Sequence, residues 1–266
     1  MNNSRARNLE KFQRLEVVKP ILSVFFHNYY GNDSHWFDLF KKEIPVSFDL
    51  YYNAVAGSYY RIRESRGSHS KASTKGTTSH NPAYIREASN KGKDIGGKLV
   101  LMDAYLRNNA STDYIMLMHD KQSPYHSNSE QWTEDLSKIS KKEYIREMLK
   151  VFQSDPKVGI VASKKVIRNE YDNDLANNAY ISTPLIKSLQ DKYNIHPRDL
   201  DYVAGTMFCV RSDIYREFFA KHPPLEIRST LEEGNVLDDE GPTVTHCWER
   251  LLAWIVLSKG LKIHGI

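Results

Sequence analysis

The pattern of apolar and polar positions divides the chain into short, alternating segments. Apolar runs of about four to eight residues, rich in β-branched or aromatic side chains, are typical of buried strands, whereas apolar positions three or four apart are typical of helices. These criteria predict strands at 21–26, 48–53, 85–88, 113–118, 158–162, 203–210 and 261–264. They predict helices at 9–18, 36–42, 98–106, 141–153, 212–221 and 243–259. Strands that alternate with helices in this way indicate an α/β fold built on a parallel, doubly wound sheet.

The length and composition of the chain suit one domain. Its 266 residues are 40% hydrophobic and 26% charged, which is enough apolar material for a single large core. We therefore expect a polar lead-in at 1–20 and one domain at 21–266. The stretch at about 64–82 is rich in Ser, Thr, Gly, Lys and His and poor in apolar residues, so it is predicted to be a mobile, solvated insertion.

Targeting and redox features are few. No run approaches the roughly 20 apolar residues of a membrane span, and the polar, basic start lacks the apolar segment of a signal peptide. Cys209 and Cys247 lie in apolar or helical runs, so we expect buried free thiols and a cytoplasmic protein. The net charge of +4 fits anionic ligands such as a nucleoside diphosphate or a lipid head group, which leaves peripheral membrane contact open. No nucleic-acid-binding motif accompanies it, so we expect no nucleic-acid partner.

Three polar clusters lie next to predicted strands or helix starts, at 27–32, 90–97 and 119–123. In open α/β sheets, ligands bind outside the carboxyl ends of the strands, so clusters that converge there indicate a site. In the third cluster, Asp120 could ligate a divalent cation that bridges a diphosphate, while Lys121 neutralises phosphate and His119 ligates or donates. From these three residues alone, a charged cap on an exposed strand end is the favoured interpretation.

The cluster at 90–97 reads Asn-Lys-Gly-Lys-Asp-Ile-Gly-Gly and precedes a predicted helix. Exposed backbone N–H groups at a helix start, together with two lysines, suit an anion. The spacing fits neither a P-loop nor a dinucleotide fingerprint, and a loop that only turns the chain explains the sequence equally well.

An acidic run, Asp238, Asp239 and Glu240, precedes the last predicted helix. These carboxylates either stabilise the helix N-terminus, by about 0.3–1 kcal/mol per charge, or supply a general base that deprotonates an acceptor hydroxyl. Both interpretations stay open.

On that last helix, His246, Glu249 and Arg250 share a face, because His246 is three residues from Glu249 and four from Arg250. A structural ion-pair stripe and a functional surface fit this spacing equally well.

Five segments, taken together in their order and spacing, resemble a known family. They are Phe48-Asp-Leu-Tyr51, Asn90-Lys-Gly-Lys-Asp-Ile-Gly96, His119-Asp-Lys-Gln-Ser123, Ala204-Gly-Thr-Met-Phe-Cys-Val-Arg211 and His246-Cys-Trp-Glu-Arg250. The chain thereby resembles the rhamnan synthesis protein F family, which consists of glycosyltransferase-like proteins of polysaccharide assembly. The resemblance runs from about Ile21 to about Ile263. Because this family is similar to the GT-A class, it implies a Rossmann-like, mixed, mostly parallel central sheet flanked by helices.

The resemblance also implies a role for each cluster. The implied donor-binding residues are His27, Tyr29, Asn90, Lys91, Gly92, Asp94, His119, Asp120 and Lys121, with His27, Tyr29 and Tyr30 beside the nucleobase. The implied acceptor side comprises Gly205, Thr206, Arg211, His246, Glu249 and Arg250. Asp120 stands where GT-A enzymes carry an Asp-x-Asp metal motif, and His264 matches a metal-binding position, so a Mn²⁺ or Mg²⁺ ion on Asp120 and His264 is implied.

The acidic run matches the location of the catalytic base in inverting members. The family tends to show Asp-Gly-Thr there, whereas this chain reads Asp238-Asp-Glu-Gly-Pro-Thr243. The base would therefore be Glu240, which directly precedes the glycine, or Asp239. The metal motif departs as well, since it holds only one carboxylate, and Lys121 could supply part of the phosphate neutralisation.

These implications give the hypothesis of an inverting transfer of a sugar from a UDP-, dTDP- or GDP-sugar to a hydroxyl of a glycan acceptor. Rhamnose as the transferred sugar follows only from the family name. The alternative is a catalytically silent nucleotide-sugar- or glycan-binding module of the same fold, which the single carboxylate favours. A nucleotidyltransferase is a weaker option, because the loop after the first strand reads His27-Asn-Tyr-Tyr-Gly31 and lacks the usual glycine-rich, basic character.

Overall fold

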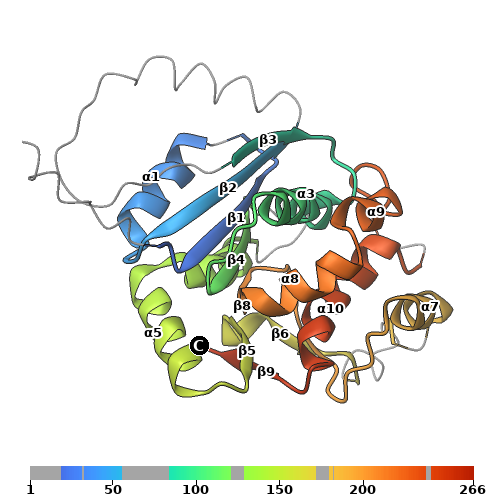
Figure 1. Ribbon diagram of the computed structural model, residues 1–266. Coiled ribbons are helices and arrows are strands. Elements are labelled where there is room, and N and C mark those ends of the chain that lie inside the picture. The colour runs from blue at the N-terminus through green and yellow to red at the C-terminus, as the bar shows by residue number, and fades with distance from the viewer. Residues whose placement is uncertain are drawn as a thin grey trace, which may run out of the picture.

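The computed structural model describes residues 19–31, 33–55, 84–120, 129–171, 180–181, 183–237 and 241–266 (Figure 1). Within them, seven strands form one central sheet in the order β3-β2-β1-β4-β8-β5-β9, and β6 pairs with β7 in a separate ribbon. The strands are β1 (Leu22–Asn28), β2 (Phe48–Val55), β3 (Tyr84–Ala88), β4 (Tyr114–His119), β5 (Val158–Ala162), β6 (Ile167–Asn169), β7 (Asp201–Val203), β8 (Phe208–Arg211) and β9 (Lys262–Gly265).

Helices pack around this sheet and connect its strands. They are α1 (Asp33–Glu43), α3 (Lys93–Arg107), α4 (Ser129–Ser137), α5 (Lys142–Ser154), α7 (Pro184–Tyr193), α8 (Ser212–Lys221), α9 (Pro224–Ser229) and α10 (Val244–Leu257), with short 3-10 turns η2 (Lys138–Ser140) and η3 (Lys164–Val166). None of the described helices has the length and apolarity needed to cross a bilayer.

The direction of the strands confirms the expected mixed, mostly parallel sheet. β1 runs parallel to β2 and β4, β2 runs parallel to β3, and β5 runs parallel to β9. β8 alone is antiparallel to its neighbours β4 and β5. The carboxyl ends of β1, β2 and β4 therefore meet at one edge of the sheet, where an open α/β fold binds its ligands.

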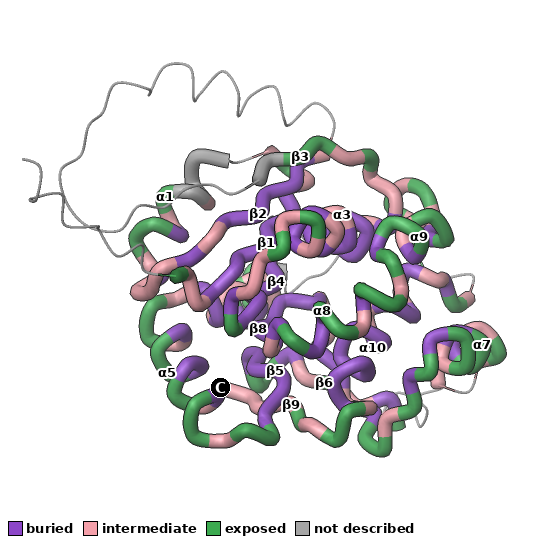
Figure 2. Tube along the Cα trace, in the orientation of Figure 1, coloured by how far each residue is buried: buried purple, intermediate pink, exposed green. Residues whose placement is uncertain are grey.

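Side-chain alternation along β1 explains why helices cover both faces of the sheet. Phe25 packs against Tyr105 of α3, with ring centroids 5.6 Å apart, whereas its neighbour Phe26 packs against Trp36 and Phe40 of α1 at 4.8 and 5.2 Å. Successive residues of a strand point to opposite faces, so a strand covered on both sides reads as a continuous apolar run. Figure 2 shows this buried centre in β1 and β2, with exposed positions on the outer faces of α5 and α7.

Most predicted elements differ from the structure by a few residues at their ends, and two differ more. The helix predicted at 98–106 begins at Lys93, so Gly96 and Gly97 lie inside α3 and not in a turn. The strand predicted at 203–210 is two strands, β7 and β8, because the backbone at Gly205 and Thr206 takes positive φ values of 75° and 53° and breaks the run. Glycine adopts that conformation readily, but threonine does not.

Other predictions divide into confirmed ones and ones outside the described residues. Cys209 and Cys247 are buried and free, as expected, and burial raises the pKa of Cys247 to about 12. A buried neutral thiol is a poor nucleophile, so neither cysteine is a candidate for covalent chemistry. The predicted helix at 9–18 and the predicted insertion at 64–82 lie outside the described residues.

Candidate functional site

The last positions of three neighbouring strands place a row of polar side chains at the carboxyl edge. In the register of the sheet, His27 of β1 lies opposite Asn53 of β2 and opposite His119 of β4. His27 Nδ1 lies 2.7 Å from Asn53 Oδ1, and the ring packs so closely against α3 that a Cβ at Gly97 would stand 2.0 Å from it. The structure thus brings His27 to the predicted edge, but beneath α3 and only 2% exposed.

Asp120 follows β4 directly and uses its carboxylate on the loop after β1. Its Oδ1 accepts the backbone N–H of Tyr29 at 2.7 Å, and its Oδ2 accepts the backbone N–H of Tyr30 at 2.5 Å. The Asp120 N–H in turn donates to the carbonyl of His27 at 3.2 Å. These hydrogen bonds fix the backbone at 28–31. Asp120 is buried, so it is not the charged cap of an exposed strand end.

A buried ionic cluster lies beside His119. Lys98 of α3 donates to Asp94 Oδ2 at 2.8 Å, contacts His119 Nδ1 at 3.2 Å, and donates to both oxygens of Thr206, the carbonyl at 2.9 Å. Thr206 Oγ1 donates to the same Asp94 oxygen at 2.5 Å. Burial alone would raise the pKa of Asp94, but the Lys98 ammonium and the hydrogen bonds hold it well below its usual range. The carboxylate is therefore ionised inside the fold.

The turn before α3 meets the loop before α10 and the loop after β1. Asn90 Nδ2 donates to Asn235 Oδ1 at 3.0 Å, and Asn235 Nδ2 donates to the Tyr29 hydroxyl at 3.0 Å. Lys91 pairs with Glu233 at 3.0 Å, and the Gly92 N–H donates to a carbonyl of the same loop at 2.8 Å. Three segments far apart in sequence thus converge on one polar surface.

Two helix N-termini lie close to this surface. α10 is capped by Thr243, whose Oγ1 accepts the His246 N–H at 3.1 Å and lies 2.7 Å from His246 Nδ1. Glu232 also caps α10, because its carboxylate accepts the N–H groups of Val244 and Thr245 at 2.6 and 2.9 Å. At the start of α3, Lys93 Nζ lies 3.5 Å from His246 Nε2. The N–H groups at the start of α10 are thus bound within the protein, whereas α3 begins without a side-chain cap and carries Lys93, which suits an anion.

Glu249 and Arg250 tie α10 to the turn between β7 and β8. Glu249 Oε1 accepts the Gly205 N–H at 2.6 Å, and its Oε2 accepts from Arg250 Nη1 at 2.6 Å. A Cβ at Gly205 would stand 2.8 Å from Leu136, so only glycine fits there. The structure therefore brings Gly205, Thr206 and Glu249 together, and their role on the acceptor side stays a prediction.

Arg250 itself is buried among polar and aromatic partners. Its Nε donates to Glu170 at 2.9 Å, and its guanidinium lies 4.3 and 4.4 Å from the ring centres of Tyr180 and Tyr202. The side chains of Arg250 and Glu170 are 8% and 0% exposed, so both are buried. This placement makes Arg250 a support for the segment around Glu170 and for Glu249, not a surface group.

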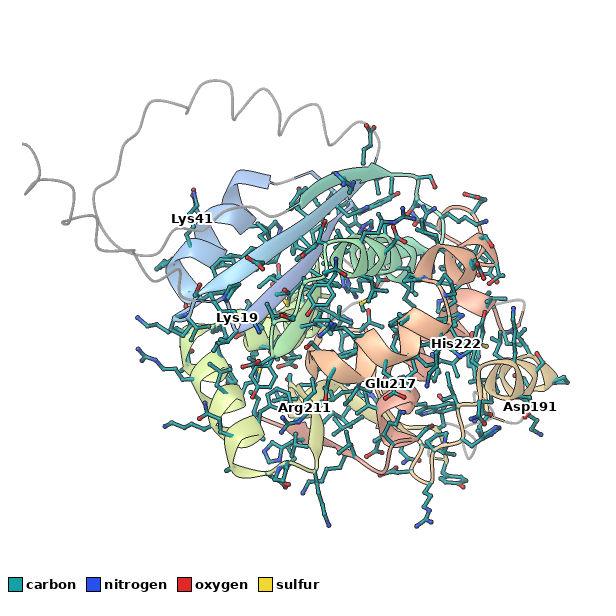
Figure 3. The ribbon with its side chains drawn as sticks, in the orientation of Figure 1. Lys19, Lys41, Asp191, Arg211, Glu217 and His222 are labelled. Carbon is teal, nitrogen blue, oxygen red and sulfur yellow. The ribbon has the colours of Figure 1, made fainter. Side chains whose placement is uncertain are left out.

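Arg211 lies away from the other predicted acceptor residues. It pairs in the sheet with Tyr114, at the start of β4, whereas His119 is at the end of that strand, roughly 16 Å away. Its guanidinium donates to the carbonyls of Val158 and Phe152 at 2.8 and 2.7 Å, and Figure 3 shows it in the lower half of the molecule. The prediction that Arg211 faces the acceptor is wrong, because the antiparallel direction of β8 sends it to the opposite edge.

The predicted metal ligands are not brought together. Through the register of β4, β8, β5 and β9, His264 lies level with Met116. Three strand spacings separate it laterally from β4, roughly 14 Å, and Asp120 lies four residues further along that strand. Both Asp120 oxygens also accept backbone N–H groups. In the part of the chain that the structure describes, no group of three or more His, Cys, Asp or Glu is placed to hold an ion. The pair Asp120 and His264 therefore does not fit a shared cation.

Three predicted residues, Lys121, Asp239 and Glu240, lie outside the described residues. Conversely, the structure adds Lys98, Glu232 and Asn235, which the sequence did not suggest. Lys98 is spaced four residues after Asp94, a helical ion-pair signal that was hidden because the helix was expected to begin only at Lys98. Glu232 and Asn235 carried no local signal, because their partners lie in distant segments.

Comparisons with known proteins found a family and a similar solved structure. A family model described as rhamnan synthesis protein F matches residues 6–261. Among solved structures, WbbM, described as a bifunctional glycosyltransferase, is similar with 13% identity and a TM-score of 0.43. The similar region covers 91% of this chain but only 44% of WbbM, so the chain spans less than half of that protein. No curated protein matches the chain.

Proposed function

Because the chain belongs to the rhamnan synthesis protein F family, we propose that it is a glycosyltransferase of polysaccharide assembly, moving a sugar from a nucleoside-diphosphate donor to a hydroxyl of a glycan acceptor. The observation that carries this proposal is the convergence of Tyr29, Asn90 and Asn235 at the carboxyl edge of the parallel strands. That edge is where open α/β sheets bind nucleotides. The proposal keeps the cytoplasmic location expected from the sequence.

The proposed reaction is a displacement at the anomeric carbon. A carboxylate, Glu240 or Asp239, takes the proton of the acceptor hydroxyl while its oxygen bonds to the anomeric carbon and the bond to the diphosphate breaks. The nucleoside diphosphate leaves with its negative charge, and the sugar is transferred with inversion. Positive groups must stabilise that charge, and we assign this role to Lys93 at the start of α3, with Lys91 on the preceding turn.

No step of this proposal passes through a metal ion, because the two predicted ligands are too far apart to share one. A divalent cation enters as an experimental variable only. The donor is proposed as a UDP-, dTDP- or GDP-sugar, and rhamnose is the sugar to examine first.

The proposal requires Glu240 and Asp120 for turnover. Removing a general base typically lowers the rate by about 10²–10⁴-fold, so Glu240→Gln should lose transfer while retaining the circular dichroism spectrum of the native protein. Asp120→Ala should also lose turnover, because the Tyr29 and Tyr30 N–H groups lose their acceptor. Asp103→Ala, whose carboxylate pairs with the exposed Arg107 on α3, is the matched control and should stay active. Full activity in both site variants would contradict the assignment.

The second candidate function is a module that binds a nucleotide sugar or glycan without turning it over. It is favoured by the engagement of both Asp120 oxygens within the protein. Calorimetric titration with nucleotide sugars, run beside a donor-hydrolysis assay, separates the two: binding heat without hydrolysis or transfer supports the module.

A further inference from the structure

Lys98 has no part in the proposed transfer so far, although it is a buried charge beside the candidate site. Its side chain is 3% exposed, and its ammonium reaches Asp94, His119 and Thr206 at once. A buried ammonium is costly unless every N–H is used, so its partners are fixed by strong interactions. Lys98 can therefore control the conformation and hydrogen bonding of His119 and Thr206.

The contact with His119 defines the state of that imidazole. The Lys98 ammonium has three hydrogens for four acceptor atoms, so the two Thr206 oxygens share one, Asp94 takes the second, and the third points to His119 Nδ1 at 3.2 Å, which accepts it. A neutral imidazole has one acceptor and one donor nitrogen, which leaves the proton on Nε2. Asp94 Oδ2 is farther from Nδ1, at 3.6 Å, and already accepts from Lys98 and Thr206.

The contact with Thr206 fixes the turn between β7 and β8. Thr206 has φ 53°, a left-handed conformation that an L-residue with a branched side chain disfavours. Lys98 holds both Thr206 oxygens, and Asp94 accepts the hydroxyl proton. The adjacent Gly205 N–H is held from the other side by Glu249 of α10. The turn is thus clamped between two helices.

From these contacts we propose that Lys98 is a positioning residue. It keeps His119 protonated on Nε2, so that an N–H donor stands at the carboxyl end of β4, and it keeps Thr206 in its left-handed conformation. The link to catalysis rests on the proposed transferase function, whereas the control of His119 and Thr206 does not.

The test uses the full chain labelled with ¹⁵N-histidine. Long-range ¹H–¹⁵N NMR spectra distinguish the two imidazole tautomers, and a His119→Gln sample identifies the His119 signals among the ten histidines. The wild-type protein should show His119 protonated on Nε2. In Lys98→Met, His119 should shift toward protonation on Nδ1, because Asp94 becomes the nearest acceptor. Arg107→Met is the matched control, since Arg107 pairs with Asp103 at the same i,i+4 spacing on the same helix but is exposed.

Protonation of wild-type His119 on Nδ1 would overturn the proposal, and so would an unchanged His119 tautomer in folded Lys98→Met. If Lys98→Met does not fold, the wild-type spectrum still decides the tautomer. Lys98→Arg, which keeps the charge and the donors, should then preserve the wild-type tautomer, and loss of it in folded protein would count against Lys98.

Kinetics supply the second readout. Misplacing the donor group should lower kcat for donor turnover by roughly ten- to hundredfold, with a smaller change in KM. A change confined to KM would contradict a positioning role in the reaction. If the tautomer is as expected but no nucleotide sugar is turned over by the wild-type protein, the proposed function fails and the structural assignment of Lys98 stands.

Discussion

At the scale of single residues, His27 shows how burial sets the chemistry of a side chain at the candidate site. Its Nδ1 contacts the Asn53 amide oxygen, and its Nε2 has no hydrogen-bond partner among the described residues. Burial lowers the pKa of His27 to about 4, since the charged ring would lose its hydration beneath α3. A neutral imidazole cannot balance the charge of a diphosphate, so lysines at this edge must supply that positive charge.

The lowered pKa of His27 predicts that stability falls with acidification. In the unfolded chain His27 has the ordinary histidine pKa of 6.5, so between pH 6.5 and 4 the unfolded chain binds a proton that the folded chain excludes. The folded protein therefore loses about 2 kcal/mol of unfolding free energy between pH 7 and 5 through this residue, and the loss is complete only below pH 4. Urea unfolding at several pH values measures it. His27→Gln should flatten the profile in that window, and an equally steep profile in this variant would contradict the prediction.

The sequence revealed the residues that follow strands but not the contacts that define them. His27, His119 and Asp120 could be placed at the carboxyl edge because strand ends converge there by topology. The engagement of both Asp120 oxygens by Tyr29 and Tyr30 depends on loop geometry, which one sequence does not encode in any local pattern. The same holds for Lys98, whose partners come from three separate elements.

At the scale of elements, α3 positions much of the candidate site, and glycines determine how closely it approaches the sheet. Gly97 faces His27 with no space for a Cβ, and Gly96 faces the carbonyl of Lys91 at 1.8 Å from an ideal Cβ. Asp94 and Lys98 reach His119 and Thr206 only because the helix lies this close. The helix carries glycine at these positions despite its low helix propensity.

Gly97→Ala should destabilise the protein even though alanine is the better helix former. The propensity gain of about 1 kcal/mol is outweighed by overpacking against His27, for a net loss of roughly 1–3 kcal/mol. Chemical denaturation measures the change. Gly260→Ala, which meets nothing within 4 Å but has φ 74°, is the control for backbone strain and should cost about 1 kcal/mol.

The cause can be separated with a double variant. In a His27→Ala background the clash is absent, so Gly97→Ala should become neutral or stabilising. A Gly97→Ala protein as stable as the wild type in the native background would show that α3 can move away from β1 without cost.

Helices and strands were predicted correctly where the spacing of apolar residues was regular. They were predicted wrongly where an unusual backbone conformation determined the bounds of the element. The buried strands β1, β4 and β5 and the amphipathic helix α5 were predictable because apolar spacing reports burial directly. The start of α3 was missed because two glycines inside a helix look like a turn. The break between β7 and β8 was missed because Thr206 adopts a left-handed conformation that its residue type disfavours.

At the scale of the whole molecule, the parallel half of the sheet provides an edge, and segments from the second half of the chain close around it. The loop at 232–235 contacts Tyr29 and Asn90, and α10 contacts the turn at 205–206 through Glu249. The candidate site therefore needs both halves of the fold, as a donor and an acceptor meeting between them would require. Fold class and strand-end residues followed from the sequence, whereas this closure follows from long-range packing only.

The central claim, sugar transfer from a nucleoside-diphosphate donor, is tested most directly by one assay on the purified chain. Release of nucleoside diphosphate is measured from UDP-, dTDP- and GDP-sugars, with and without Mn²⁺ and with and without a glycan acceptor. One nucleotide class should be turned over, and the acceptor should accelerate the release. Absence of release from every donor, with acceptor and Mn²⁺ present and the protein folded, would contradict the central claim.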